Sequence, residues 1–123
     1  MIDHVSIGVK DLASAGEFYE SVLSKLGHKK LIEKSGTIGF GKKYPEFWLN
    51  HRPNRAKEPD NGMHICLRCS SSDSVTEFYE TAMASGASDA GEPGFRPEYT
   101  AGYFAAFIMD ADGNKIEAVT FVT

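Results

Sequence analysis

Two histidines and one glutamate are the residues of this chain whose types and places could do chemistry. His4 opens the segment HVSI, and His64 opens the similar segment HICL sixty residues later. Glu117 lies in an otherwise apolar segment near the end of the chain, where an inward carboxylate needs a cation or hydrogen-bond donors. Two neutral imidazoles and a carboxylate suit a divalent metal such as Fe, Mn, Zn or Ni and leave positions open for a substrate. The alternative is a hydrogen-bonded polar cluster without metal.

The two histidine segments belong to an internal duplication. The same offset of sixty residues carries EFYE at 17–20 onto EFYE at 77–80. A repeat of this length is one supersecondary unit that is too small to bury a core alone, so the copies must pair with each other or with copies from another chain. The functional site is therefore expected where the copies meet.

The first copy, over residues 1–50, has the pattern of a strand, a helix and three further strands. Alternating apolar residues predict a strand over 2–9, and helical spacing predicts a helix that starts after Asp11 or Ser14 and ends at Gly27. Short strands are expected at 29–34, 37–41 and 47–50. His28 follows the helix, where a histidine is most often solvated near a helix C-terminus.

The second copy, over residues 63–123, repeats this order after a linker over 51–62 that is rich in Pro, Asn, Gly and charges. A strand is expected over 64–68, followed by a helix capped by Ser72 or Asp73 with Met83 among its inward residues. The glycine- and proline-rich segment 87–96 predicts a short strand plus a loop. Two clear strands are expected over 103–109 and 115–122, joined by a tight turn.

Composition and charge restrict the class of protein. The 123 residues are 41% apolar and 24% charged, and the net charge of −4 argues against binding nucleic acid or an anionic membrane. No signal-peptide pattern or membrane-length apolar run is present, so a cytoplasmic location is expected. Cys66 and Cys69 have the CxxC spacing but lie on opposite faces in or at the end of a strand, which favours small buried thiols over a redox pair.

The chain resembles the vicinal oxygen chelate superfamily in three features. These are the paired βαβββ units, the His that opens each unit, and the DADG turn at 110–113 that is followed by Glu117. This superfamily includes glyoxalase I, bleomycin-resistance proteins, fosfomycin-modifying enzymes and extradiol dioxygenases. The resemblance implies an α+β fold in which two βαβββ modules pair around a central cleft. It also implies that His4, His64 and Glu117 bind one divalent metal, which a substrate with adjacent oxygens chelates while Glu117 or a metal-bound water moves a proton.

Departures from the family pattern restrict the activities that are expected of this chain. Trp48 falls at the position of the fourth glyoxalase I ligand, a Glu, and an indole cannot ligate a metal. Extradiol dioxygenases have an active-site His before the penultimate strand and a Tyr within it, where this chain has EYT at 98–100 and Phe107. Fosfomycin-modifying enzymes have basic residues after the last ligand, and residues 118–123 of this chain contain none. Two classes remain: a metal-dependent lyase or isomerase with an unidentified substrate, and a non-catalytic small-molecule or antibiotic-binding protein.

Strand parity also predicts the residues that line the cleft. They are Trp48, Asn50, Arg68, Tyr103 and Phe107, with Arg96 and Tyr99 in a loop that could fold over them. The aromatic side chains favour a flat or apolar ligand, and Arg68 or Arg96 is available for a carboxylate or carbonyl. We expect a small-molecule ligand and a homodimer. Pairing of the modules within or between chains stays open, because the linker can span either arrangement.

Overall fold

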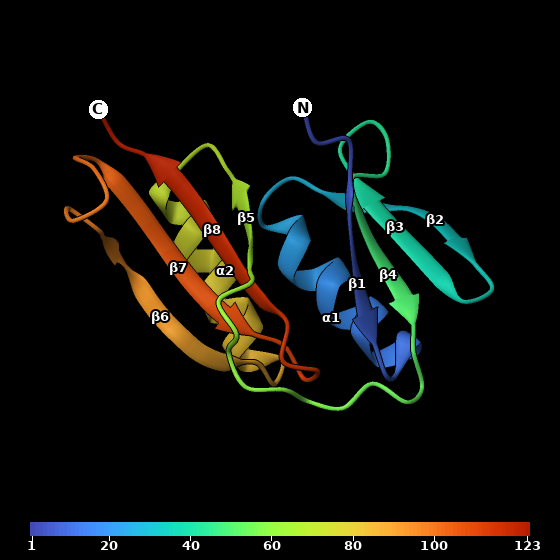
Figure 1. Ribbon diagram of the computed structural model, residues 1–123. Coiled ribbons are helices and arrows are strands. Elements are labelled where there is room, and N and C mark those ends of the chain that lie inside the picture. Colours follow the sequence, from blue (N-terminus) through green and yellow to red (C-terminus); the bar gives the residue numbers. More distant parts are fainter.

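The order of elements along the chain repeats once in the computed structural model, which describes residues 1–123. The first module consists of β1 (Val5–Val9), α1 (Leu12–Ser24), β2 (Lys29–Lys34), β3 (Thr37–Gly41) and β4 (Phe47–His51). The second consists of β5 (Ile65–Arg68), α2 (Ser72–Ala84), β6 (Ser88–Phe95), β7 (Tyr103–Met109) and β8 (Lys115–Phe121). Figure 1 shows the two modules side by side. The predicted α+β fold of two βαβββ modules is confirmed.

Each module forms one four-stranded sheet. Sheet A has the order β1-β4-β3-β2 and sheet B the order β5-β8-β7-β6. In both, the first strand pairs in parallel with the last, and the other pairs are antiparallel. The strands β1 and β5 are therefore edge strands, and each has a hydrogen-bonded neighbour on one side only.

The two helices are positioned by similar signals. At the start of α1 the Asp11 carboxylate accepts the Ser14 backbone N–H, and at the start of α2 the Ser71 hydroxyl accepts that of Ser74. The second cap lies one residue before the predicted ones, because Ser71 has the extended backbone that a cap requires. Met83, predicted to face inward, is 37% exposed. It lies in the last turn of α2.

Strand β6 is longer than predicted. The segment 87–96 forms an eight-residue strand rather than a short strand with a loop, and its register against β7 shifts on both sides of Gly91. Bulges of this kind let a strand continue through glycine and proline, because the extra residues are left out of the ladder.

One hydrophobic core joins the modules. Residues of α1 and sheet A pack with residues of α2 and sheet B in a single cluster of 18 buried side chains. Within it the hydroxyl of Tyr19 on α1 donates to Oδ2 of Asp110 at 2.6 Å. Asp110 also accepts the backbone N–H groups of Asp112 and Asn114, so the turn before β8 is fixed against the helix of the other module. No helix is long and apolar enough to cross a membrane.

His28 is buried, contrary to the prediction of a solvated residue. Only 7% of it is exposed, and its Nδ1 has no hydrogen-bond partner. The chain turns back at Gly27, which has a φ of 87°, and the backbone N–H of His28 donates to the carbonyl of Leu23, so His28 is buried instead of lying in solvent. Burial, partly offset by Glu46, lowers the pKa of His28 below its ordinary value, so the imidazole is neutral at pH 7.

We expect His28 to make the protein less stable in mild acid. Because its pKa is lower in the folded protein than in the unfolded chain, where it is about 6.5, the unfolded chain binds the proton more tightly. The contribution is fully present above that value and is lost as the pH falls through the folded pKa. Urea unfolding between pH 7.5 and 5 should show a smaller loss of free energy for His28→Leu than for wild type. The exposed His51→Leu should follow wild type, and parallel curves for all three proteins would contradict the assignment.

Candidate functional site

The candidate site lies on the face of sheet B that is turned away from α2, which we call the open face. Along β8, Ile116 and Ala118 point into the core under α2, so Glu117 between them points to the open face. It lies between Cys66 on β5 and Phe107 on β7, its direct partners in the two ladders. The alternation of β8 thus places a carboxylate at the middle of the open face.

Glu117 is almost fully buried and is satisfied by two donors. The residue is 2% exposed. Its Oε1 lies 2.9 Å from Nε2 of His64, and its Oε2 accepts the hydroxyl of Tyr103 at 2.5 Å. Because an isolated buried carboxylate is strongly unfavourable, these two contacts allow the charge to remain in the sheet.

The groups beside Glu117 are held in their protonated forms. Burial and then the hydrogen bond to Glu117 raise the pKa of the Tyr103 hydroxyl, so it remains a donor at neutral pH. Burial of the thiol, followed by the charge of Glu117 and a hydrogen bond to it, raises the pKa of Cys66 to about 12. Cys66 is therefore a thiol and not a reactive thiolate, whereas Cys69 is buried behind the strand.

The structure brings two of the three predicted metal ligands together. His64 and Glu117 are in contact, but His4 is exposed and its Nδ1 lies 2.7 Å from Oδ1 of the neighbouring Asp3. No group of three His, Cys, Asp or Glu side chains in the chain could hold a metal ion. Figure 1 shows β1 and β5 running in opposite directions, so the histidines that precede them lie toward opposite ends of the two strands.

The donor set fits a divalent metal in part. An imidazole and a buried carboxylate in contact are ligands that Mn, Fe, Zn or Ni accepts, and a metal could replace the proton that they share. One chain supplies two such ligands, which leaves room for a third from elsewhere. The open face of sheet B therefore holds two side chains, His64 and Glu117, that could ligate a metal.

The predicted substrate-binding residues divide between the two sheets. Five lie on or beside the open face of sheet B: Arg68, Arg96, Tyr99, Tyr103 and Phe107. Trp48 and Asn50 lie on the corresponding face of sheet A, where the indole packs over Gly39 and the amide oxygen accepts the hydroxyl of Thr37 at 3.0 Å.

Sequence reasoning missed two neighbours of the site. The sequence predicts Cys66 to be a small buried thiol, whereas this residue is exposed, lies two residues after His64 on the same face and is the direct ladder partner of Glu117. Lys115 has its Nζ 5.4 Å from the centre of the Phe107 ring and 3.0 Å from Oδ2 of Asp60. The period of two along β5 and β8 was the signal that could have identified both.

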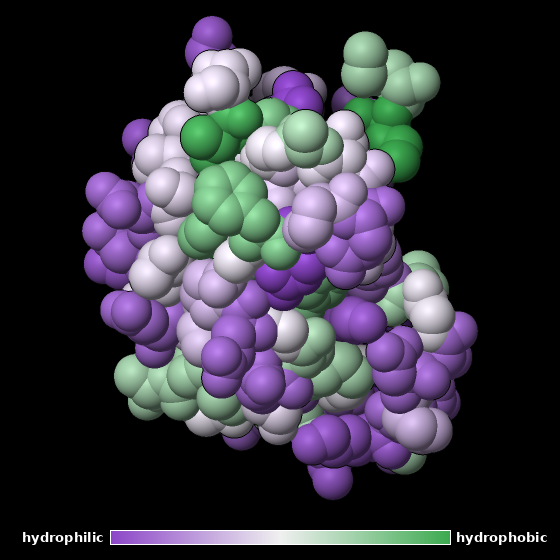
Figure 2. All heavy atoms as spheres, turned by 90° about the vertical axis from the view of Figure 1, so that its left-hand side faces the viewer, coloured by the Kyte–Doolittle hydropathy of each residue, from purple (hydrophilic) through white to green (hydrophobic).

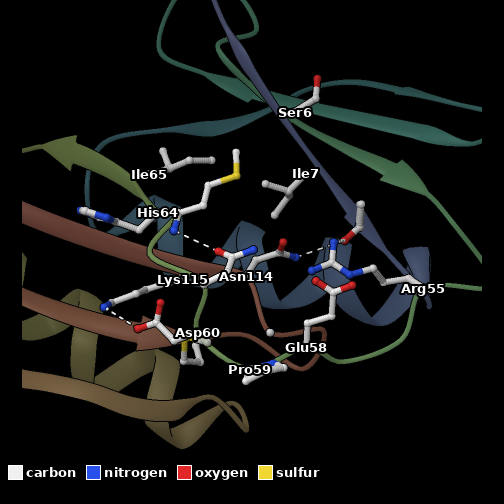
Figure 3. A pocket seen from close by; sticks show the side chains of 15 residues that line it. Ser6, Ile7, Arg55, Glu58, Pro59, Asp60, His64, Ile65, Asn114 and Lys115 are labelled. Atoms are coloured by element: carbon white, nitrogen blue, oxygen red, sulfur yellow. Dashed lines mark hydrogen bonds and ion pairs between the residues drawn. The ribbon is translucent and has the colours of Figure 1, made fainter.

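A separate pocket of about 330 Å³ lies between β1, the linker and the starts of β5 and β8. Figure 3 shows it with Ser6 and Ile7 on one side and His64 and Lys115 on the other. Arg55 crosses it by donating to the carbonyls of Gly8 and Asp112, each at 3.2 Å. Its lining includes His64 but neither Glu117 nor any predicted substrate-binding residue. The pocket adjoins the candidate site without containing it.

Comparison with known proteins identifies the family. The family model described as Glyoxalase/Bleomycin resistance protein/Dioxygenase superfamily matches residues 1–118. A glyoxalase/bleomycin resistance protein from Albidiferax ferrireducens T118 is 27% identical, with a TM-score of 0.84 over 96% of this chain and 97% of that one.

More distant solved structures share the fold. The fosfomycin resistance protein FosX from Listeria monocytogenes is 16% identical, with a TM-score of 0.73 over 99% of this chain and 93% of its own. A variant of FosX solved with Mn(II) and 1S,2S-dihydroxypropylphosphonic acid is 17% identical, with a TM-score of 0.72 over 97% and 88%. Comparison with curated proteins gave no match.

Removal of the Tyr103 hydroxyl should destabilise the protein because it leaves Glu117 buried with one donor fewer. We expect Tyr103→Phe to lower the free energy of unfolding by about 1–2 kcal/mol. The matched control is Tyr99→Phe, whose exposed ring packs edge-on against Tyr103, and its effect should stay within about 0.5 kcal/mol. Urea unfolding at pH 7 measures both. Equal effects would show that the hydroxyl of Tyr103 does not support the carboxylate.

Proposed function

Because this chain belongs to the Glyoxalase/Bleomycin resistance protein/Dioxygenase superfamily, we propose that it is a metal-dependent enzyme acting on a small molecule with two adjacent oxygens. The reaction type is that of a lyase or isomerase. The observation that carries the proposal is the buried carboxylate of Glu117 in contact with His64, on an open sheet face lined by aromatic and cationic side chains.

His64 and Glu117 would hold the metal, together with a third ligand. The metal, when bound, supplies a Lewis acid that polarises the substrate oxygens. The chain's own side chains would orient the carboxylate, move the proton and bind the substrate. Tyr103 orients the carboxylate by donating to its Oε2. Glu117 or a metal-bound water would take a proton from the bound substrate and return it to the product. Phe107 and Tyr99 would contact the body of the substrate.

The third ligand in this proposal is His4 of a second copy. His4 has a side chain that is 51% exposed, and it precedes β1, whose outer edge has no partner in sheet A. The edge of β5 beside His64 is equally free. In a two-fold symmetric dimer each such contact occurs twice, so two copies would give two complete sites, each with ligands from both chains.

A second function is favoured by the row of aromatic rings on the open face. Tyr99, Tyr103 and Phe121 stack edge-on in sequence, with ring centres 5.1 and 5.3 Å apart. Such a row could hold a flat molecule without metal or turnover, as in a drug-sequestering protein. The two functions differ in whether metal is needed for ligand binding.

The test is metal binding by the purified protein. Isothermal titration with Mn(II) should give stoichiometric binding to wild type and affinity at least about tenfold weaker for His64→Ala and Glu117→Gln. Mn(II) should also raise the thermal midpoint of wild type, because it binds only the folded state. The control Glu77→Gln removes the same charge from the exposed side of α2 and should bind normally. Absence of Mn(II), Fe(II), Zn(II) and Ni(II) binding by wild type would rule out the metal-dependent enzyme and leave the binding function.

A further inference from the structure

The aromatic ring of Phe107 is flanked by two cationic side chains and by the imidazole of His64. The guanidinium carbon of Arg96 lies 5.6 Å from its centre and Nζ of Lys115 lies 5.4 Å from it. The ring of His64 is 5.9 Å away, centre to centre. Phe107 is also the direct ladder partner of Glu117. Positive charge therefore gathers on the open face next to the proposed metal ligands.

Arg96 is the cation of this group that has no acidic partner. Lys115 forms an ion pair with Asp60 at 3.0 Å, but Arg96 lies within 4.0 Å of no carboxylate oxygen. Its Nη1 donates to the carbonyl of Gly94 at 2.9 Å and its Nη2 to the carbonyl of Glu92 at 2.8 Å. A guanidinium has five N–H groups, so several remain for a ligand after these two bonds have fixed its position.

The backbone of β6 is irregular at Gly91, where it makes room for the side chain of Arg96. A side-chain carbon at Gly91 would lie 2.9 Å from Cδ1 of Phe107 and 3.2 Å from Nη2 of Arg96. The register of β6 shifts at the same residue, whose φ of 155° is a conformation that favours glycine. The bulge and the glycine together let Arg96 lie against Phe107.

The surroundings differ for the other arginine of the open face. Arg68 lies 4.5 Å from the centre of the Phe121 ring and is exposed, at the far end of β5 from His64. Arg96 is half-buried and held in place. Figure 2, which looks at the sheet-B side of the molecule, shows hydrophobic surface bordered by hydrophilic side chains. A ligand beside Arg96, Phe107 and Tyr103 would combine a flat apolar body with an anionic group.

We propose that Arg96 binds the carboxylate of the substrate, and that the substrate is a small carboxylic acid whose two adjacent oxygens lie at His64 and Glu117. This rests on the proposed function for the position of those oxygens. The planar fork of a guanidinium matches the two oxygens of a carboxylate, and its fixed position reduces the entropy lost on binding. The ring of Phe107 lies between Arg96 and His64 and would contact the body of the substrate.

The experiment compares 3,4-dihydroxybenzoate with its neutral isostere 3,4-dihydroxybenzamide by isothermal titration of the Mn(II)-loaded protein. We expect the acid to bind at least about tenfold more tightly than the amide, as a charge-assisted pair requires. Arg96→Gln should reduce this ratio to about one while it keeps the affinity for the amide, which shows that the variant is folded. Arg96→Lys should give an intermediate ratio, and Arg52→Gln, which alters a surface arginine of the linker, should behave as wild type.

The two proposals fail in different ways. A ratio near one in wild type, an unchanged ratio in Arg96→Gln, or no binding of the acid would overturn the role of Arg96. Tighter binding of 3,4-dihydroxyphenylphosphonate than of the carboxylate would overturn the substrate class. If the acid binds equally well after Mn(II) is removed and the ratio still depends on Arg96, the role of Arg96 stands and the metal-dependent function fails.

Discussion

A carboxylate buried in the middle of a strand is the constraint on which the open face of sheet B depends. An ionised group in such a place is unfavourable by several kcal/mol or more unless donors or a cation meet it. Glu117 is met by His64, which directly precedes β5, and by Tyr103 from β7, one on each side of β8. A purely structural role would be served better by an apolar residue, because replacing a buried charge cluster with packed hydrophobic groups is often neutral or stabilising. The arrangement is instead suited to a cation that binds from solvent.

The duplication explains why His4 does not join His64 and Glu117 within one chain. It places a histidine at the start of the first strand in each module, but β1 and β5 run in opposite directions at the junction of the modules, which separates His4 from His64. The common core and the bond between Tyr19 and Asp110 hold the modules in this relation. Both first strands keep a free edge. A second copy therefore offers a route by which equivalent histidines meet, without any rearrangement within the chain.

The strands and helices were largely predictable from the sequence, because alternation along β3, β7 and β8 and the caps near Asp11 and Ser71 are local signals. The features that the sequence did not predict depend on turns and bulges of the backbone. Bulges at Gly91 extend β6, and the turn at Gly27 buries His28. The sequence predicted that His4, His64 and Glu117 bind one metal. The structure places His64 and Glu117 in contact but leaves His4 apart from them. Alternation along single strands cannot predict that separation. That separation is a property of how the modules pack.

The central claim, that a metal is shared between two copies through His4 of one and His64 and Glu117 of the other, is tested most directly by mixing two defective proteins. His4→Ala and Glu117→Gln should each fail to bind Mn(II) as homodimers. Unfolded together and refolded, they should regain about a quarter of the wild-type sites, because half of the dimers are mixed and each mixed dimer has one intact site. Electron paramagnetic resonance of bound Mn(II) would count them. No recovery in the mixture, with mixed dimers confirmed by mass spectrometry, would contradict the shared site.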